Sequence, residues 1–152
     1  MSGLNNKQVE KFGKLMLGDD FLGVYPCDSM PRINNLENKS VVFNLSKHNE
    51  PGSHYIAVLF SKDKICYFDS FGKPLRNKHI KENLKKFKIP IYNHIRPIQS
   101  KDSIFCGFFV LAYLKAIRLL KLQPYEFYNL FNNPPNKKND EEHNQNSLFW
   151  LT

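Results

Sequence analysis

The chain has 152 residues, of which 41% are hydrophobic and 14% aromatic, and it carries a formal net charge of +8 at pH 7. This length suits one domain with one sizeable core, and this composition excludes a disordered chain. No stretch approaches the roughly 18 apolar residues of a membrane span, and the N-terminus lacks the apolar run of a signal peptide. We therefore expect a soluble, intracellular protein that forms a single domain over residues 1–152 and has no membrane contact.

The three cysteines, Cys27, Cys66 and Cys106, are odd in number and include no CxxC pair. Neither a zinc site nor a disulfide framework is therefore indicated. Reduced thiols in a reducing compartment are the simplest explanation, and we expect no cofactor to be required.

The positive charge leaves two interpretations open. A basic chain can bind a polyanion, so DNA is one candidate partner. However, lysine supplies most of the 22 basic residues and asparagine is abundant, a bias typical of any protein from an AT-rich genome. No RGG, KH or RNP-type motif accompanies the charge.

The first half of the chain predicts one helix and an antiparallel hairpin. Val9, Phe12, Leu15 and Met16 share one face of a helix over 7–16. The Gly-, Pro-, Asp- and Asn-rich stretch that follows is typical of a loop with brief extended pieces. Branched and aromatic residues then indicate strands over 40–46, 54–60 and 64–72, the last two joined by a short turn.

The second half predicts more helix than strand. An amphipathic helix over 75–88 precedes a strand over 89–95, and an apolar run from Cys106 to about Leu120 indicates a helix buried in the core. A short helix opens at Pro124. A polar tail loop over 132–146 and a segment over 147–151 that packs back onto the body complete the chain.

These elements predict an α+β fold. We expect a small antiparallel sheet with helices to one side and a buried central helix that carries Cys106 at its N-terminus.

Cys106 is the candidate nucleophile. Helix N-termini stabilise a thiolate, which is the reactive form of cysteine. Gly107 beside it leaves room for a substrate backbone to approach. The structural alternative is an ordinary buried cysteine that behaves as a small hydrophobic residue.

His54 and Asp69 are the candidate base and its orienting group. His54 opens the first strand of the hairpin and Asp69 ends the second, so the hairpin brings the two residues together. A carboxylate at this place would hold the imidazole tautomer and stabilise the imidazolium. The structural alternative for Asp69 is a cap for the turn that follows it.

Gln99, seven residues before Cys106, is the candidate oxyanion donor. Its amide N–H and the backbone N–H of Cys106 together would form an oxyanion hole. Most glutamines in loops are simply solvated, so this assignment depends on the position of Gln99 relative to Cys106.

The segments GSHY, CYFDSFGKPL and QSKDSIFCGFFVLAYL, in that order, resemble the adenain family of adenovirus-type maturation cysteine proteases. Related forms occur in virophages and Maverick/Polinton elements, within the clan that includes Ulp-type SUMO proteases. The order His, Asp, Gln, Cys is similar to the clan's order. The resemblance extends more weakly to DDFLGVYPCDSMP and to NPPN…NQNSLFWL, which resembles the family's C-terminal loop and final helix.

Two features depart from the family pattern. Tyr55 stands where family members usually have Trp after the catalytic histidine. Adenovirus enzymes bind an activating peptide through a disulfide to a cysteine upstream of the nucleophile, and residues 86–99 contain no cysteine. Because no cysteine is present there for a disulfide-linked activator, we expect activity either alone or with non-covalent stimulation, and the charge of +8 makes DNA a candidate.

The resemblance implies a cysteine endopeptidase that cleaves viral or transposon capsid precursors at Gly-containing sites, with His54, Asp69, Gln99 and Cys106 as its catalytic residues. We expect a monomer in the virion and the host-cell interior. One alternative is a Ulp-like protease acting on a ubiquitin-like modifier, although such enzymes use a Trp-rich surface and this chain has one Trp. A second alternative is a non-catalytic basic module that binds nucleic acid.

Overall fold

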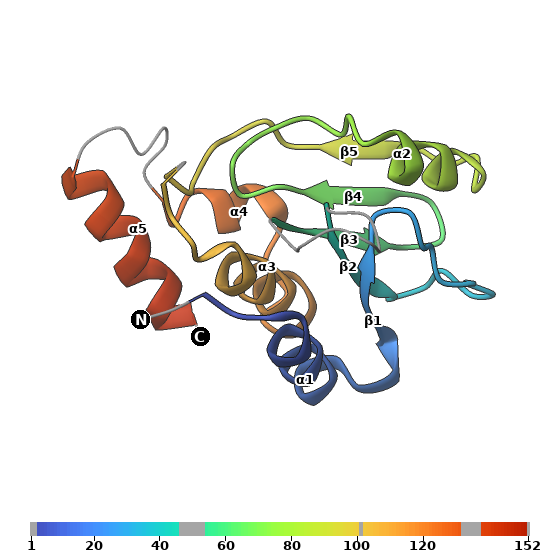
Figure 1. The fold of residues 1–152 in the computed structure, drawn as a ribbon, viewed down its shortest axis with the longest axis horizontal. Helices are drawn as coiled ribbons and strands as arrows, with labels where there is room; N and C mark the ends of the chain where they lie inside the picture. The colour runs from blue at the N-terminus through green and yellow to red at the C-terminus, as the bar shows by residue number, and fades with distance from the viewer. Residues whose placement is uncertain (1–2, 46–53, 101, 132–137, 152) are drawn as a thin grey trace.

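The computed structural model describes residues 3–45, 54–100, 102–131 and 138–151 (Figure 1). The elements follow in the order α1 (Asn6–Leu17), η1 (Gly18–Asp20), β1 (Phe21–Pro26), β2 (Ser40–Asn44), β3 (Tyr55–Phe60), β4 (Ile65–Phe68), α2 (Lys78–Lys85), β5 (Ile91–Asn93), α3 (Cys106–Leu114), η2 (Lys115–Leu119), α4 (Pro124–Tyr128) and α5 (Lys138–Leu151). None of the described helices is long and apolar enough to cross a membrane.

The five strands form one sheet in the order β1-β2-β3-β4-β5. The two central pairings, β2 with β3 and β3 with β4, are antiparallel, whereas β1 and β5 run parallel to their neighbours. The predicted α+β class is confirmed, but the sheet is mixed rather than wholly antiparallel. A parallel neighbour requires a crossover connection, and α2 lies within the connection between β4 and β5.

Both faces of the sheet are buried, so every residue of β2 and β3 is buried. Side chains alternate along each strand, which sends Val42 and Ala57 to one core and Val41 and Ile56 to the other. α3 packs in the first core, and α2 supplies Ile80 and Leu84 to the second. The expectation of helices on one side is therefore correct for α3 but wrong for α2.

Helix α3 lies at the centre of the molecule, where it contacts β3, α1 and α5 (Figure 1). Its first residue is Cys106, as predicted, and eight of its nine residues are buried. The helix continues through the π-helical turn η2, which ends at Leu119, close to the predicted end near Leu120. Phe68 and Tyr113 stack at 4.2 Å between ring centroids and so fix α3 against β4.

Two elements differ from the sequence prediction. β1 forms within a stretch predicted as loop with brief extended pieces, and α5 replaces most of the predicted polar tail loop. Residues 132–137 of that loop lie outside the described residues. Leu148 of α5 is fully buried, and Asn144 donates a 3.0 Å hydrogen bond to the carbonyl of Ile98. Tertiary contacts thus hold a polar helix that the sequence pattern does not indicate.

Candidate active site

The β3–β4 hairpin places His54 beside Asp69. His54 immediately precedes β3 and Asp69 immediately follows β4, so the two residues lie at the same end of the paired strands. His54 Nε2 lies 2.8 Å from Asp69 Oδ1, and both side chains are almost entirely buried. We expected the short turn of the hairpin to bring His54 and Asp69 together, and the two side chains are in contact.

Asp69 also caps the turn that follows it. Its Oδ1 accepts a 2.8 Å hydrogen bond from the backbone N–H of Phe71, and its carbonyl accepts one from Gly72. The structural interpretation of Asp69 as a turn cap is therefore correct, and it coexists with the contact to His54. The cap holds the carboxylate in place when the imidazole titrates.

The ionisation of His54 is set by opposing effects. Burial lowers the pKa of His54, but the hydrogen bond to Asp69, the nearby thiol of Cys106 and the charges of both groups raise it to about 9. The environment therefore favours the imidazolium at neutral pH. Asp69 takes Nε2, so Nδ1 is the ring nitrogen left for Cys106; this atom is buried and makes no hydrogen bond of regular geometry to a described residue.

Cys106 opens onto a cavity of about 430 Å³. Cys106 is the first residue of α3. The N-cap residue of this helix, Phe105, makes no side-chain capping hydrogen bond. Backbone N–H groups in the first turn of a helix carry partial positive charge, which favours an anion there. The cavity, here called the Cys106 cavity, is lined by Leu4, Asn5, Asn6, Tyr55, Phe71, Ser103, Ile104 and Cys106.

Phe71 covers the imidazole. Its ring stacks on that of His54 at 4.4 Å between centroids, with 29° between the planes. This contact excludes water from one face of the imidazole and restricts its rotation. An aromatic face also favours a cation above it, in agreement with the raised pKa of His54.

Gln99 lies behind the Cys106 cavity rather than in it. Its amide nitrogen donates to the carbonyl and the hydroxyl of Ser103, at 3.0 and 3.2 Å. Its amide oxygen accepts a hydrogen bond from the Ser70 hydroxyl. The structure thus brings His54, Asp69 and Cys106 together and leaves the donor of Gln99 engaged by Ser103, which itself lines the cavity.

The space above Gly107 is already filled. A Cβ atom at this position would lie 3.1 Å from Cβ of Leu4 and 3.3 Å from Cγ2 of Val9. Gly107 therefore allows the N-terminal segment to pack against α3, and the expectation that it admits a substrate backbone is wrong.

Three residues of the site escaped the sequence analysis: Asn6, Phe71 and Ser103. Phe71 stands in the segment FDSFG, and an aromatic residue just after the acidic residue is a signal that could have been used. Asn6 and Ser103 are polar residues near a helix start and in a loop, and no local pattern distinguishes them from solvated ones.

Comparison with known proteins gives a distant likeness to a viral protein. No protein-family model matches the chain. A protein of Acanthamoeba polyphaga mimivirus named "Putative thiol protease" is 28% identical over 98 residues, which are 57% of this chain and 32% of that protein. The chain spans about a third of that relative's length.

Proposed function

We propose that the chain is a cysteine endopeptidase in which His54, Asp69 and Cys106 form the catalytic triad. The observation that carries the proposal is the imidazole of His54, which is hydrogen-bonded to Asp69 through Nε2 and whose pKa is raised by Cys106 as well. A buried histidine between a carboxylate and a thiol at a helix N-terminus is the arrangement that nucleophilic thiol chemistry needs. The likeness to a viral protein named as a thiol protease supports the same class.

The proposed reaction has two stages. The Cys106 thiolate attacks the peptide carbonyl carbon, a C–S bond forms, and the carbonyl oxygen becomes an oxyanion. The C–N bond then breaks as the His54 imidazolium gives its proton to the leaving amine. Water, deprotonated by His54, hydrolyses the thioester, releases the carboxylic acid and restores the thiol. Asp69 keeps Nε2 occupied, so the imidazole presents Nδ1 to the thiol throughout.

The resemblance to adenain supports capsid precursors of a virus or transposon as substrates, cut at Gly-containing sites. The proposal includes a monomeric enzyme in the virion and host-cell interior that requires no cofactor. The charge of +8 supports non-covalent stimulation by DNA.

The substrate proposal is tested by co-expressing capsid proteins of the source element with the wild-type chain or with Cys106→Ala. Mass spectrometry should find new N-termini next to glycine in the wild-type sample alone. Cuts in the tail of a ubiquitin-like protein instead would favour the Ulp-like alternative. Binding to DNA with no new termini would favour the nucleic-acid module.

Gln99 completes the proposal as an oxyanion donor. This role requires the substrate to displace Ser103 from the Gln99 amide, because the nitrogen of that amide is engaged. Gln99→Ala should then lower kcat about 10²- to 10³-fold with little change in KM, since the donor acts once charge develops. Steady-state kinetics on a fluorogenic peptide measures both constants.

Ser103→Ala is the matched variant for this prediction. It removes the hydroxyl contact but leaves the Gln99 amide in place, so kcat should stay near the wild-type value. If Gln99→Ala lowered the melting temperature and left kcat unchanged, Gln99 would be only a support for its loop.

The pH dependence of the reaction should reflect His54. Activity requires the imidazolium–thiolate pair, so kcat/KM should fall as the pH rises through about 9, the pKa of His54. Asp69→Asn removes the charge and weakens the hydrogen bond, both of which raise this pKa, so the alkaline limb should move to lower pH. Glu82→Gln removes the same charge from an exposed position on α2 and should leave the profile unchanged. An alkaline limb that does not move in Asp69→Asn would contradict the assignment.

A further inference from the structure

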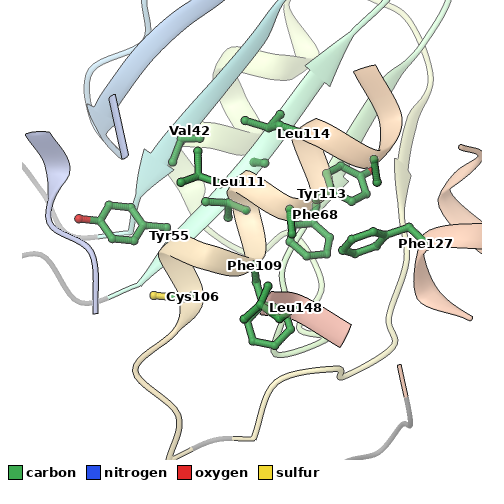
Figure 2. Close-up of a cluster of buried hydrophobic side chains, with 14 of the residues drawn as sticks. Val42, Tyr55, Phe68, Cys106, Phe109, Leu111, Tyr113, Leu114, Phe127 and Leu148 are labelled. Carbon is green, nitrogen blue, oxygen red and sulfur yellow. The ribbon is translucent and has the colours of Figure 1, made fainter. Parts of the chain in front are cut away.

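Asn6, the first residue of α1, is tied to the wall of the Cys106 cavity. Its Oδ1 accepts a 2.6 Å hydrogen bond from the Tyr55 hydroxyl and a longer one, 3.4 Å, from Asn44 Nδ2. Tyr55 follows His54 directly and is 7% exposed. Figure 2 shows the Tyr55 hydroxyl directed out of the apolar cluster toward the N-terminal segment, at the same end of the cluster as the Cys106 sulfur.

These contacts fix which way the Asn6 amide faces. A hydroxyl and an amide nitrogen both donate to Oδ1, so this atom is the acceptor and Nδ2 lies on the other side of the amide. Burial, and then the charge of Cys106, raise the pKa of Tyr55, so its phenol stays neutral and able to donate beside a thiolate. Among the described residues, Nδ2 of Asn6 has no hydrogen-bond partner, whereas Asn6 itself lines the cavity with Cys106.

An amide donor that lines the same cavity as the nucleophile, and that has no hydrogen-bond partner among the described residues, fits one kind of ligand group. Two other side-chain amides lie in this region: that of Gln99 is engaged by Ser103, and the oxygen of Asn5, which also lines the cavity, accepts a hydrogen bond from the backbone N–H of Gln8. An extended peptide presents carbonyl oxygens on both sides of the scissile bond, and these need donors when they leave water.

We propose that Asn6 is a substrate-binding residue whose Nδ2 donates a hydrogen bond to a main-chain carbonyl of the peptide in the Cys106 cavity, with Tyr55 as the positioning residue that orients it. The inference rests on the proposed peptidase function. The inference also assigns a role to Tyr55, which stands where members of the resembling family usually have Trp. An indole N–H would lie at a different distance from Asn6 than the Tyr55 hydroxyl does.

The test is steady-state kinetics on a fluorogenic peptide amide with Gly-Gly before the scissile bond. Asn6→Ala should raise KM roughly two- to twelvefold, as expected for one neutral hydrogen bond, with kcat within about twofold of wild type. Tyr55→Phe should raise KM by less, because the amide remains but is free to turn. Asn146→Ala, an exposed asparagine on α5, serves as the control and should change neither constant.

The double variant Asn6→Ala/Tyr55→Phe separates positioning from general damage. If Tyr55 acts through Asn6, the double variant should be no worse in KM than Asn6→Ala alone, whereas independent effects would add. An unchanged KM in Asn6→Ala overturns the inference, and so does a fall in kcat at constant KM, which would place the donor on the oxyanion. A wild-type chain that cleaves no peptide overturns the proposed function itself.

Discussion

Replacement of His54 by alanine should lower kcat for peptide hydrolysis about 10²- to 10⁴-fold, the usual contribution of a positioned general acid and base. His54 is the residue that deprotonates Cys106 and protonates the leaving amine in the proposed reaction. Its raised pKa of about 9 reflects contacts with Asp69 and Cys106 that alanine removes together. Kinetics with a fluorogenic peptide measures the loss, and circular dichroism verifies that the variant is folded.

His94→Ala is the matched control. His94 is partly buried, and its pKa is lowered by burial and by the charge of Arg96, so it lacks the anionic partners that His54 has. We expect kcat to remain near wild type. If His94→Ala abolished activity and His54→Ala were mild, the base would be wrongly assigned.

Phe68→Ala should destabilise the fold by about 3–5 kcal/mol, the usual cost of removing a buried phenylalanine. Phe68 is fully buried, stacks on Tyr113 of α3 and contacts Phe127 of α4 edge-to-face. It also directly precedes Asp69, so a cavity here would loosen the end of β4 that carries the carboxylate. The free energy of unfolding is measured by urea denaturation.

Tyr125→Ala is the control for this effect, because Tyr125 is 60% exposed and lies on α4, the helix that Phe68 contacts through Phe127. Its change in unfolding free energy should stay within about 0.5 kcal/mol, as is usual for surface substitutions. A loss below 1 kcal/mol in Phe68→Ala would mean that the core between β4 and α3 is not packed as described.

The hairpin and the start of α3 were predictable because they depend on local patterns. Two apolar strands joined by a short turn can pair in few ways, and this alone brings His54 to Asp69. The buried helix that begins at Cys106 follows from an apolar run without polar interruptions.

The remaining features depend on tertiary contacts that a single sequence does not encode locally. β1 contains Gly23 and ends at Pro26, residues that disfavour strands, and it forms because β2 offers a partner. α5 is mostly polar and is held by Leu148 and Asn144.

The direction of a polar side chain is set in the same way. The hydrogen bond to Ser103 orients the amide of Gln99, and the hydrogen bond from Tyr55 orients the amide of Asn6. Each of these partners lies in another segment or in an irregular loop, so sequence spacing could place Gln99 near the nucleophile but not orient its amide, and it did not indicate Asn6 at all.

The rate at which iodoacetamide alkylates each cysteine at neutral pH tests whether Cys106 is the activated nucleophile, and this measurement needs no known substrate. Cys66 is the more exposed thiol but burial raises its pKa, whereas Cys106 is 8% exposed and lies beside the imidazolium of His54. We expect mass spectrometry to find Cys106 labelled fastest, and we expect His54→Ala to slow this labelling while Cys27 and Cys66 keep their rates. Faster labelling of Cys66 or Cys27, or a Cys106 rate that His54→Ala leaves unchanged, would contradict the role of Cys106 as the activated nucleophile.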